Sequence, residues 1–542
     1  MPTYLDPLPP WEPHERPSMP GSPSTPLHPP PIRAAYALGS ILLGITGGLG
    51  NALVTANLPY IQGDLGLTPS QGAWLTASYL MVNVSANLVL VKFRQQFGLV
   101  RFAEIGLSCY AVLTLLHVFV NTFSMAVAVR AASGFAGATL TTLATLYMLQ
   151  AFRKAQAGKA QVLGVGVSQL ATPLAWVLSP PLRDMGEWHR LYIFESGLAL
   201  CSLAFITLLK LPPGIRIKAF EWMDALTIAL LAPALALIAA VVAQGRIQWW
   251  FTQPWIGYSL VAAIVLLIAV LLIERNRHNP LIQTRWLGTI EMLRFTLGAI
   301  MLRFLLSEQT FGAVGLLQYL GMNADQLQAL YTVILLCVMA GIGISALIFS
   351  PQTQLPQIVV SIVLIGIASF LDSHSSSLTR PHDMYFSQGL LALASGMFFG
   401  PLMLIGFMRA VQNGANYLVS FTVLFALTQS LGGLAGPALF GTFETVREKY
   451  HSSYLVEQID PTDPRIAQRL QLQGQVYGST QGDPVLRQAM GSAQFGQIVT
   501  REANVLAFND VFRLIGLTST GFLCWSLYHT VRDIRRKRQT AA

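Results

Sequence analysis

Long apolar blocks separated by short polar stretches make up the chain from residue 35 onward. A helix needs about twenty apolar residues to cross the hydrocarbon core of a bilayer. Measured against that length, the pattern predicts an all-α integral membrane protein with about fourteen transmembrane helices. They are expected near residues 35–59, 73–91, 102–120, 123–149, 161–181, 190–211, 223–244, 256–273, 292–317, 326–350, 357–371, 385–408, 417–441 and 508–530.

The two ends of the chain differ from this pattern. Residues 1–33 are rich in proline and polar residues, a composition that buries too little apolar surface to fold alone, so we expect a disordered cytoplasmic tail. This segment lacks the basic region followed by an apolar run that marks a cleaved signal peptide. Residues 531–542 form a short basic tail.

Positive charge in the loops predicts the orientation. Cytoplasmic loops of membrane proteins carry an excess of lysine and arginine. With both termini cytoplasmic, the short outer loops hold only Arg183, Arg190, Arg246 and Arg380, and the inner segments hold many basic residues. The inner set is Lys92, Arg94, Arg101, Arg153, Lys154, Lys159, Lys210, Arg216, Lys218, Arg275, Arg277, Arg285, Arg532, Arg535, Arg536, Lys537 and Arg538.

This orientation describes a multi-pass protein of the cell inner (plasma) membrane with an even number of spans. It places the long segment 442–502 on the outer face. A loop of that length is uncommon unless it has a function. Two interpretations remain open for it, a functional element or a poorly ordered connector.

Composition narrows the classes of function. Hydrophobic residues make up 53% of the chain and charged residues only 11%. The net charge of +9 comes from basic residues in short loops, without the basic stripe typical of nucleic-acid binding. The four cysteines all lie within apolar blocks and have no CxxC partner, so neither a metal site nor a cofactor is expected.

An enzyme is not expected either. A membrane-embedded enzyme would need clustered histidine, aspartate or cysteine at a membrane face. His374 and His382 share one predicted outer loop, but no HxxxH or paired-carboxylate motif accompanies them. No GxxxxGK[ST] sequence for ATP binding occurs in the chain.

Several short motifs resemble the fourteen-span drug:proton antiporter branch of the major facilitator superfamily. One runs from Asn57 through Pro59 to Leu65 and continues from Ser70 to Leu80; Arg130 with Ser133-Gly134 and the glycine-rich stretch Leu431–Pro437 are the others. The resemblance implies two six-helix halves, 34–211 and 290–530, with two additional spans and a linker at 212–289. It also implies alternating access and proton-driven export of amphipathic or aromatic small molecules.

The sequence departs from the motifs of that family at four places, one of which is the fifth-span Gly-Pro motif, present only as Ala175-Trp176 with Thr172-Pro173 nearby. An acidic residue usually lies nine positions before the proline that matches Pro59, and this chain has Gly50. Gln95 replaces the aspartate that usually lies three residues before Gly98, and Ser133 replaces the fourth-span glutamine. The alternatives are therefore a transporter with different coupling, such as uniport or another ion, and a scaffold of the same fold.

Ionisable residues inside spans are candidates for proton coupling, because a charge at the bilayer centre costs about 3 kcal/mol on insertion scales. Glu308 is the first candidate and Glu195 the second, followed by Arg130 and His117. Each also has a plain structural interpretation, as a paired charge or a hydrogen-bonded core histidine. Candidates for the lining of a substrate cavity are Arg303, Trp74, Tyr79, Trp176 and Phe311.

Glycine and proline pattern the spans in a way that favours close packing and bending of helices. The motif positions are Gly48, Pro59, Gly98, Gly134, Gly432, Gly436 and Pro437. Expected partners are the lipid bilayer, a small-molecule substrate and protons, with a periplasmic adaptor protein docking near 442–502 as a further hypothesis.

Overall fold

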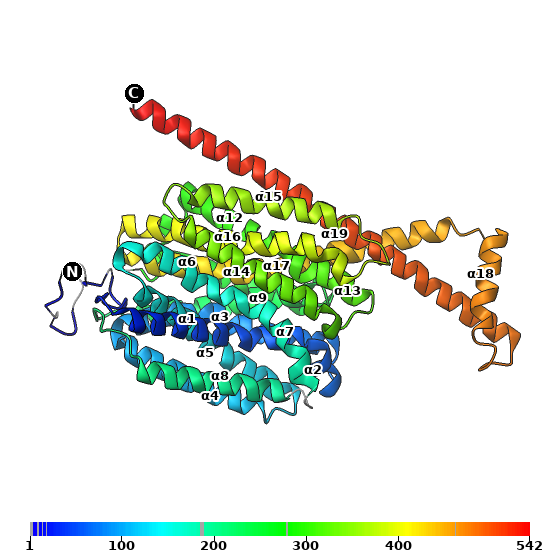
Figure 1. Cartoon of the computed structure of the whole chain (residues 1–542), viewed down its shortest axis with the longest axis horizontal. Helices are drawn as coiled ribbons and strands as arrows, with labels where there is room; N and C mark the ends of the chain where they lie inside the picture. The colour runs from blue at the N-terminus through cyan, green and yellow to red at the C-terminus, as the bar shows by residue number, and fades with distance from the viewer. Residues whose placement is uncertain are drawn as a thin grey trace.

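The computed structural model describes residues 4–7, 10–12, 15–17, 19–184, 189–277, 280–460 and 462–541. Helices run side by side along the long axis of the molecule, and a helical hairpin projects from one end (Figure 1). Apart from two isolated bridges, the described residues contain no β-structure.

The first half of the bundle contains eight α-helices and two short 3₁₀ segments. They are α1 (Pro30–Ala56), α2 (Leu58–Asp64), α3 (Pro69–Phe97), α4 (Leu99–His117), α5 (Phe123–Ala151), η1 (Lys154–Gln156), α6 (Ala157–Val167), η2 (Ser168–Leu170), α7 (Ala171–Asp184) and α8 (His189–Leu208). Within it, α1 packs on α5, α7 and α8, and α4 packs on α5 and α8.

Local sequence sets the boundaries of these helices. Pro59 lies in the first turn of α2, where its missing N–H is no loss. Thr68 and Gln71 form a capping box at the start of α3, with Pro69 in its first turn. This helix ends at Gly98, whose φ of +88° belongs to the left-handed region that glycine adopts without strain.

The rest of the chain forms the remaining helices. They are α9 (Trp222–Gly245), η3 (Trp250–Thr252), α10 (Pro254–Arg275), α11 (Thr284–Leu287), α12 (Ile290–Leu305), the π-helical η4 (Glu308–Ala313), α13 (Val314–Tyr319), α14 (Ala324–Leu347), α15 (Gln354–Asp372), η5 (Pro381–Met384), α16 (Tyr385–Asn413), α17 (Ala415–Glu457), α18 (Pro464–Gln475) and α19 (Pro484–Ala541).

Within the part of the chain that the structure describes, twelve helical stretches are long and apolar enough to cross a membrane. Two further segments predicted to span, 292–317 and 508–530, are also helical but carry ionisable residues along their length. The first includes Arg303 and Glu308, and the second Asp510 and Arg513. The fold is that of a multi-pass helical membrane protein, and the count of fourteen stays a prediction.

An ionic network fixes α9 and α10 to the first half of the bundle. Lys92, near the end of α3, is paired with the fully buried Asp224 of α9. Arg277 contacts Asp224 at 2.9 Å and Glu274 at 2.8 Å. Above this network, apolar residues of α3, α9, α10 and α17 form one shared core. Helix α9 therefore packs on both α3 and α17, and α10 packs on α9.

The described residues of the N-terminal segment make specific contacts with the bundle. They pair with the loop after α8: the Gly21 N–H donates to the Ile215 carbonyl at 3.1 Å, and the Ser24 N–H donates to the Pro213 carbonyl at 3.1 Å. Asp6 forms an ion pair with Arg216. Backbone hydrogen bonds to a partner strand can order a segment that has little apolar side chain to bury.

The long segment 442–502 is largely helical. Helix α17 continues beyond the bundle to Glu457, α18 follows, and α19 starts at Pro484 and returns to the bundle (Figure 1). Gly474 and Gly491 allow α18 and α19 to approach closely, since a Cβ on Gly491 would lie 2.7 Å from the Gly474 nitrogen. The hairpin projects at the end of the molecule opposite both chain termini (Figure 1).

Candidate functional site

Two buried carboxyl groups meet in the second half of the bundle. Glu308 is 0% exposed and Asp372, the last residue of α15, is 5% exposed. The Gln388 amide of α16 lies between them: its Nε2 is 3.1 Å from both Glu308 carboxylate oxygens and 2.8 Å from Asp372 Oδ2. The two carboxyl groups are also within hydrogen-bonding reach of each other.

Their environment makes this pair the strongest candidate for proton chemistry. Ser387 donates to Asp372 Oδ1 at 2.5 Å, and the described residues contain no basic partner within ion-pair distance of either carboxyl group. Like charges in contact and away from water repel strongly, so one shared proton stabilises such a pair. Glu308 begins the π-helical segment η4, a rare distortion that is frequent at functional sites.

Asp372 and Gln388 were not found from the sequence. Asp372 follows the apolar run 357–371 directly, the usual place for a solvated boundary residue. Gln388 is one uncharged polar residue near the start of a span. Only the packing of α15 on α16 buries both. The sequence does show that Asp372 and Gln388 are polar residues near the two ends of the same loop, but this is a weak indication of a site.

Arg130 lies in the first half, 2% exposed, and is held by several acceptors. Its Nη1 donates to the Gly50 carbonyl at 2.5 Å, and its Nη2 donates to Asn51 Oδ1 at 2.6 Å. Its guanidinium also stacks over Tyr79, 4.6 Å from the ring centroid. This arrangement ties α5 to α1 and α3.

Glu195, of α8, is buried beside Gly50. Tyr110 donates to Glu195 Oε1 at 2.6 Å, whereas Glu195 Oε2 has no hydrogen-bond partner among the described residues. A Cβ on Gly50 would lie 2.7 Å from Glu195 Oε1 and 2.3 Å from the Tyr110 hydroxyl. The glycine therefore leaves the space that the glutamate and tyrosine side chains fill. Sequence reasoning predicted Glu195 but not its neighbour Tyr110.

His117 fits a structural role more closely. Its Nδ1 lies 2.9 Å from the Leu113 carbonyl, and its ring stacks on Tyr192 with centroids 4.5 Å apart. Its Nε2 has no hydrogen-bond partner among the described residues. The ring is thus packed against Tyr192 and makes a hydrogen bond through one of its two nitrogens. It belongs to neither of the two carboxyl sites.

The predicted cavity aromatics do not gather in one place. Trp176 of α7 stacks in parallel on Tyr331 of α14, with centroids 4.7 Å apart, so it joins the two halves. Trp74 instead lies against Trp255 of α10, at 5.9 Å. Tyr79 lies under Arg130. Phe311 belongs to η4 and packs near Phe508 at 5.9 Å.

Arg303 lies on α12 against the glycine-rich motif of α17. A Cβ on Gly432 would be 3.0 Å from Arg303 Cβ, and one on Gly433 would be 3.2 Å from its Nε. That Nε has no hydrogen-bond partner in the described structure, and neither has Oε1 of Gln429. The guanidinium is therefore available to an additional acceptor.

Close helix contacts explain the remaining motif glycines. A Cβ on Gly134 would lie 2.2 Å from the Tyr79 carbonyl oxygen, and one on Gly436 would lie 1.7 Å from Ser307 Oγ. A Cβ on Gly48 would lie 2.3 Å from the Cβ of Ala171. Pro437 follows within α17. These positions need glycine because a neighbouring helix occupies the space of a side chain.

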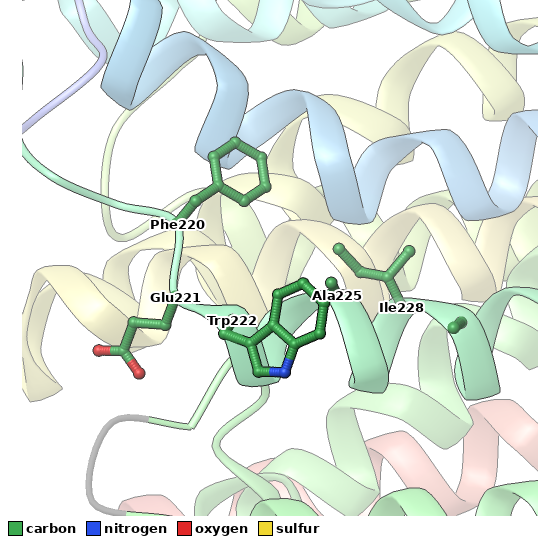
Figure 2. A pocket seen from close by; sticks show the side chains of 6 residues that line it. Phe220, Glu221, Trp222, Ala225 and Ile228 are labelled. Carbon is green, nitrogen blue, oxygen red and sulfur yellow. The ribbon is translucent and has the colours of Figure 1, made fainter.

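Two cavities open near the ends of the bundle. A groove of about 570 Å³ at the start of α9 is lined mainly by apolar side chains (Figure 2). Its one carboxylate, Glu221, is directed away from Trp222 (Figure 2) and lies 3.1 Å from Arg277. A second cavity, of about 610 Å³, opens at the hairpin end beside η4. In the described residues no group of three or more His, Cys, Asp or Glu side chains is arranged to hold a metal ion.

Comparison with known proteins agrees with this architecture. A family model described as Major Facilitator Superfamily matches residues 40–437. The multidrug export protein EmrB of Haemophilus influenzae is 23% identical over 88% of this chain and 91% of its own. The probable multidrug resistance protein EmrY of Escherichia coli is 22% identical over 86% of this chain and 90% of its own.

Solved structures of transporters share the fold. A bacterial homologue of the human drug peptide transporters superposes with a TM-score of 0.58, at 11% identity, over 93% of this chain and 99% of its own. The human organic anion transporter MFSD10 gives a TM-score of 0.54, at 13% identity, over 91% of this chain and 100% of its own.

Proposed function

The chain belongs to the major facilitator superfamily of membrane transporters, and from that premise we propose that it exports amphipathic or aromatic small molecules in exchange for protons. Similarity to multidrug export proteins over most of the chain supports the export of such compounds. Helices that approach through glycine at several crossings support an alternating-access movement of the two halves.

The observation that carries proton coupling is the buried pair Glu308 and Asp372 with Gln388 between them. A pair that holds one proton changes its charge when that proton leaves, and the Gln388 amide stabilises the negative charge that remains. Ionisable groups in this position are costly in a bilayer unless they have a function. In this proposal the pair binds a proton when it faces outside and releases it when it faces inside.

Glu195 is proposed as a second proton site. The sequence lacks the first-span acidic residue at Gly50, which argued against antiport. The carboxylate of Glu195 lies directly beside that glycine, so the first half still has a buried acid at this place. The guanidinium of Arg130, which donates a hydrogen bond to the Gly50 carbonyl, would respond to a change in the charge of Glu195.

We further propose an inner-membrane location, with both termini cytoplasmic and the hairpin 442–502 outside. The two-half organisation with boundaries near 211 and 290 is part of the same proposal. A periplasmic adaptor protein is proposed to dock on the hairpin. The exposed apolar side chains of the hairpin, including Tyr450, Tyr454 and Leu472, support a protein contact there.

The test is substrate-dependent proton release from the purified protein in lipid, with Glu308→Gln as the main variant. We expect the variant to bind substrate but to release fewer protons per substrate than the unaltered protein, because its amide cannot give one up near neutral pH and only Glu195 would still contribute. Asp372→Asn should behave in the same way. Glu291→Gln is the matched control, since Glu291 is an exposed glutamate on the adjoining helix α12.

Each contrary result points to a named alternative. Proton release that is undiminished in both Glu308→Gln and Asp372→Asn removes the pair from the mechanism. Transport without proton release in the unaltered protein would favour uniport or another ion. Binding of partners without any transport would favour a scaffold.

A further inference from the structure

The cavity at the hairpin end lies where five parts of the chain meet. Its volume is about 610 Å³, within the usual size of small-molecule sites. The end of α9 contributes Arg246, η4 contributes Phe311, and α13 contributes Tyr319. The remaining wall comes from α17 and α19, at the level where these helices leave the bundle to form the hairpin.

Aromatic rings and carboxylates line this cavity together. Phe311 and Phe508 pack near each other on one side, with centroids 5.9 Å apart. Glu444 and Glu448 line it from successive turns of α17. The face of an aromatic ring attracts a cation, and a nearby carboxylate strengthens that attraction. The guanidinium of Arg246 already lies in such a position, 4.8 Å from the centroid of the Phe311 ring.

The charges of the lining do not cancel. Arg246 is 3.3 Å from Glu444 and compensates that carboxylate. Glu448 forms no hydrogen bond or ion pair with the described part of the chain. Of the basic residues outside the lining, Arg447 is paired with Asp510 at 2.6 Å, and Arg501 donates to the Ser377 carbonyl at 3.2 Å, which leaves its charge uncompensated. Among the residues that line the cavity, one carboxylate charge therefore remains beside an aromatic wall.

We propose that this cavity is a binding site for an amphipathic organic cation, at the hairpin end of the second half of the bundle. The cation would lie against Phe311 with its charge toward Glu448. The site is connected to the carboxyl pair, because Phe311 and Glu308 belong to the same six-residue π-helical segment. A ligand that displaces Phe311 would shift η4 and with it the contact between Glu308 and Gln388.

The inference rests on the proposed function only in treating the ligand as cargo; binding itself is tested separately. The probe is tetraphenylphosphonium, and the matched control ligand is tetraphenylborate, which has the same shape and the opposite charge. Equilibrium binding is measured with the full chain in lipid nanodiscs, after subtraction of binding to empty nanodiscs. The variants are Glu448→Gln, which removes the charge, and Thr500→Trp, which fills the cavity from the α19 side.

We expect the cation to bind and the anion not to bind above the empty-nanodisc level. Glu448→Gln should weaken cation binding about threefold, as expected for a partly exposed charge. Thr500→Trp should weaken it further by excluding the ligand. Glu457→Gln, an exposed glutamate further along α17, should leave binding unchanged.

Equal binding of both ions, or cation binding unaffected by both Glu448→Gln and Thr500→Trp, would overturn the inference. The two proposals fail in distinguishable ways. Cation binding that depends on Glu448 without any proton release would leave this site in place and reject antiport. Proton-coupled transport of the cation with binding insensitive to both variants would retain antiport and reject this site.

Discussion

At the scale of single residues, Gly134 sets how closely α5 can approach α3. Replacing it with alanine would place a Cβ 2.2 Å from the Tyr79 carbonyl oxygen, so the two helices must separate. Arg130 contacts the same part of α3, through the Leu75 carbonyl at 3.2 Å. We expect Gly134→Ala to destabilise the protein by about 1–3 kcal/mol, the usual cost of overpacking, measured as a lower thermal unfolding midpoint in detergent.

Gly197→Ala on α8 is the control for this change. A Cβ there meets no atom within 4 Å, so the unfolding midpoint should stay the same or rise. Equal midpoints for the two variants would mean that the contact between Gly134 and Tyr79 is not tight in the membrane. The comparison separates close helix packing from the general effect of removing a glycine from a helix.

Some residues of the candidate site could be predicted from the sequence, and others could not. Glu308, Glu195 and Arg130 could be predicted, because a charge inside an apolar block is costly and therefore informative. Asp372 lies one residue beyond such a block, where charge is common, so nothing marks it. Its pairing with Glu308 depends on the packing of η4, α15 and α16, which no short motif encodes.

At the scale of elements, the contact between α7 and α14 joins the two halves at their hairpin-side ends. Arg183 of α7 is 2.6 Å from Asp325 of α14, beside the stacked rings of Trp176 and Tyr331. Reversing the charge of one partner, by Arg183→Asp or by Asp325→Arg, would place two like charges next to each other. We expect each single variant to change the initial rate of efflux from proteoliposomes about two- to fivefold, the range for a partly exposed pair.

The double variant, with both charges exchanged, restores the attraction and should recover most of the original rate. A double variant whose rate equals the combined effects of the singles would show that the pair does not act as a contact between the halves. Because Asp325 is 54% exposed, raising the salt concentration should reduce the difference between single variants and the unaltered protein.

Elements were predictable where composition and length alone decide the structure. Each predicted span falls on helical segments, although 161–181 includes the 3₁₀ segment η2 and 292–317 the π-helical η4, since an apolar block of about twenty residues has few other ways to satisfy its backbone in lipid. The helices of the hairpin and the ordered N-terminal segment were not predicted. Gly474 and Gly491 pack two polar helices together, and residues 21–24 pair with the backbone of 213–215, so neither depends on an apolar pattern.

At the scale of the whole molecule, both chain ends lie opposite the hairpin (Figure 1). An even number of crossings produces this arrangement, and the basic loops and basic tail predict that the shared side is the cytoplasm. A fluorescent protein fused after residue 542 should therefore fluoresce, because it folds in the cytoplasm. Alkaline phosphatase inserted at Gly478, in the turn between α18 and α19, should be active, because it folds only outside.

The reverse pair of fusions serves as the control, since each reporter then lies in the compartment where it stays inactive. Phosphatase activity at the C-terminus together with fluorescence at Gly478 would invert the orientation. It would also place the Lys92–Asp224–Arg277 network outside and the cation cavity inside, and so reverse the direction in which the carboxyl pair would take up protons. Two active reporters of the same kind would mean that the number of crossings between residues 478 and 542 is even, and that α19 does not span the membrane.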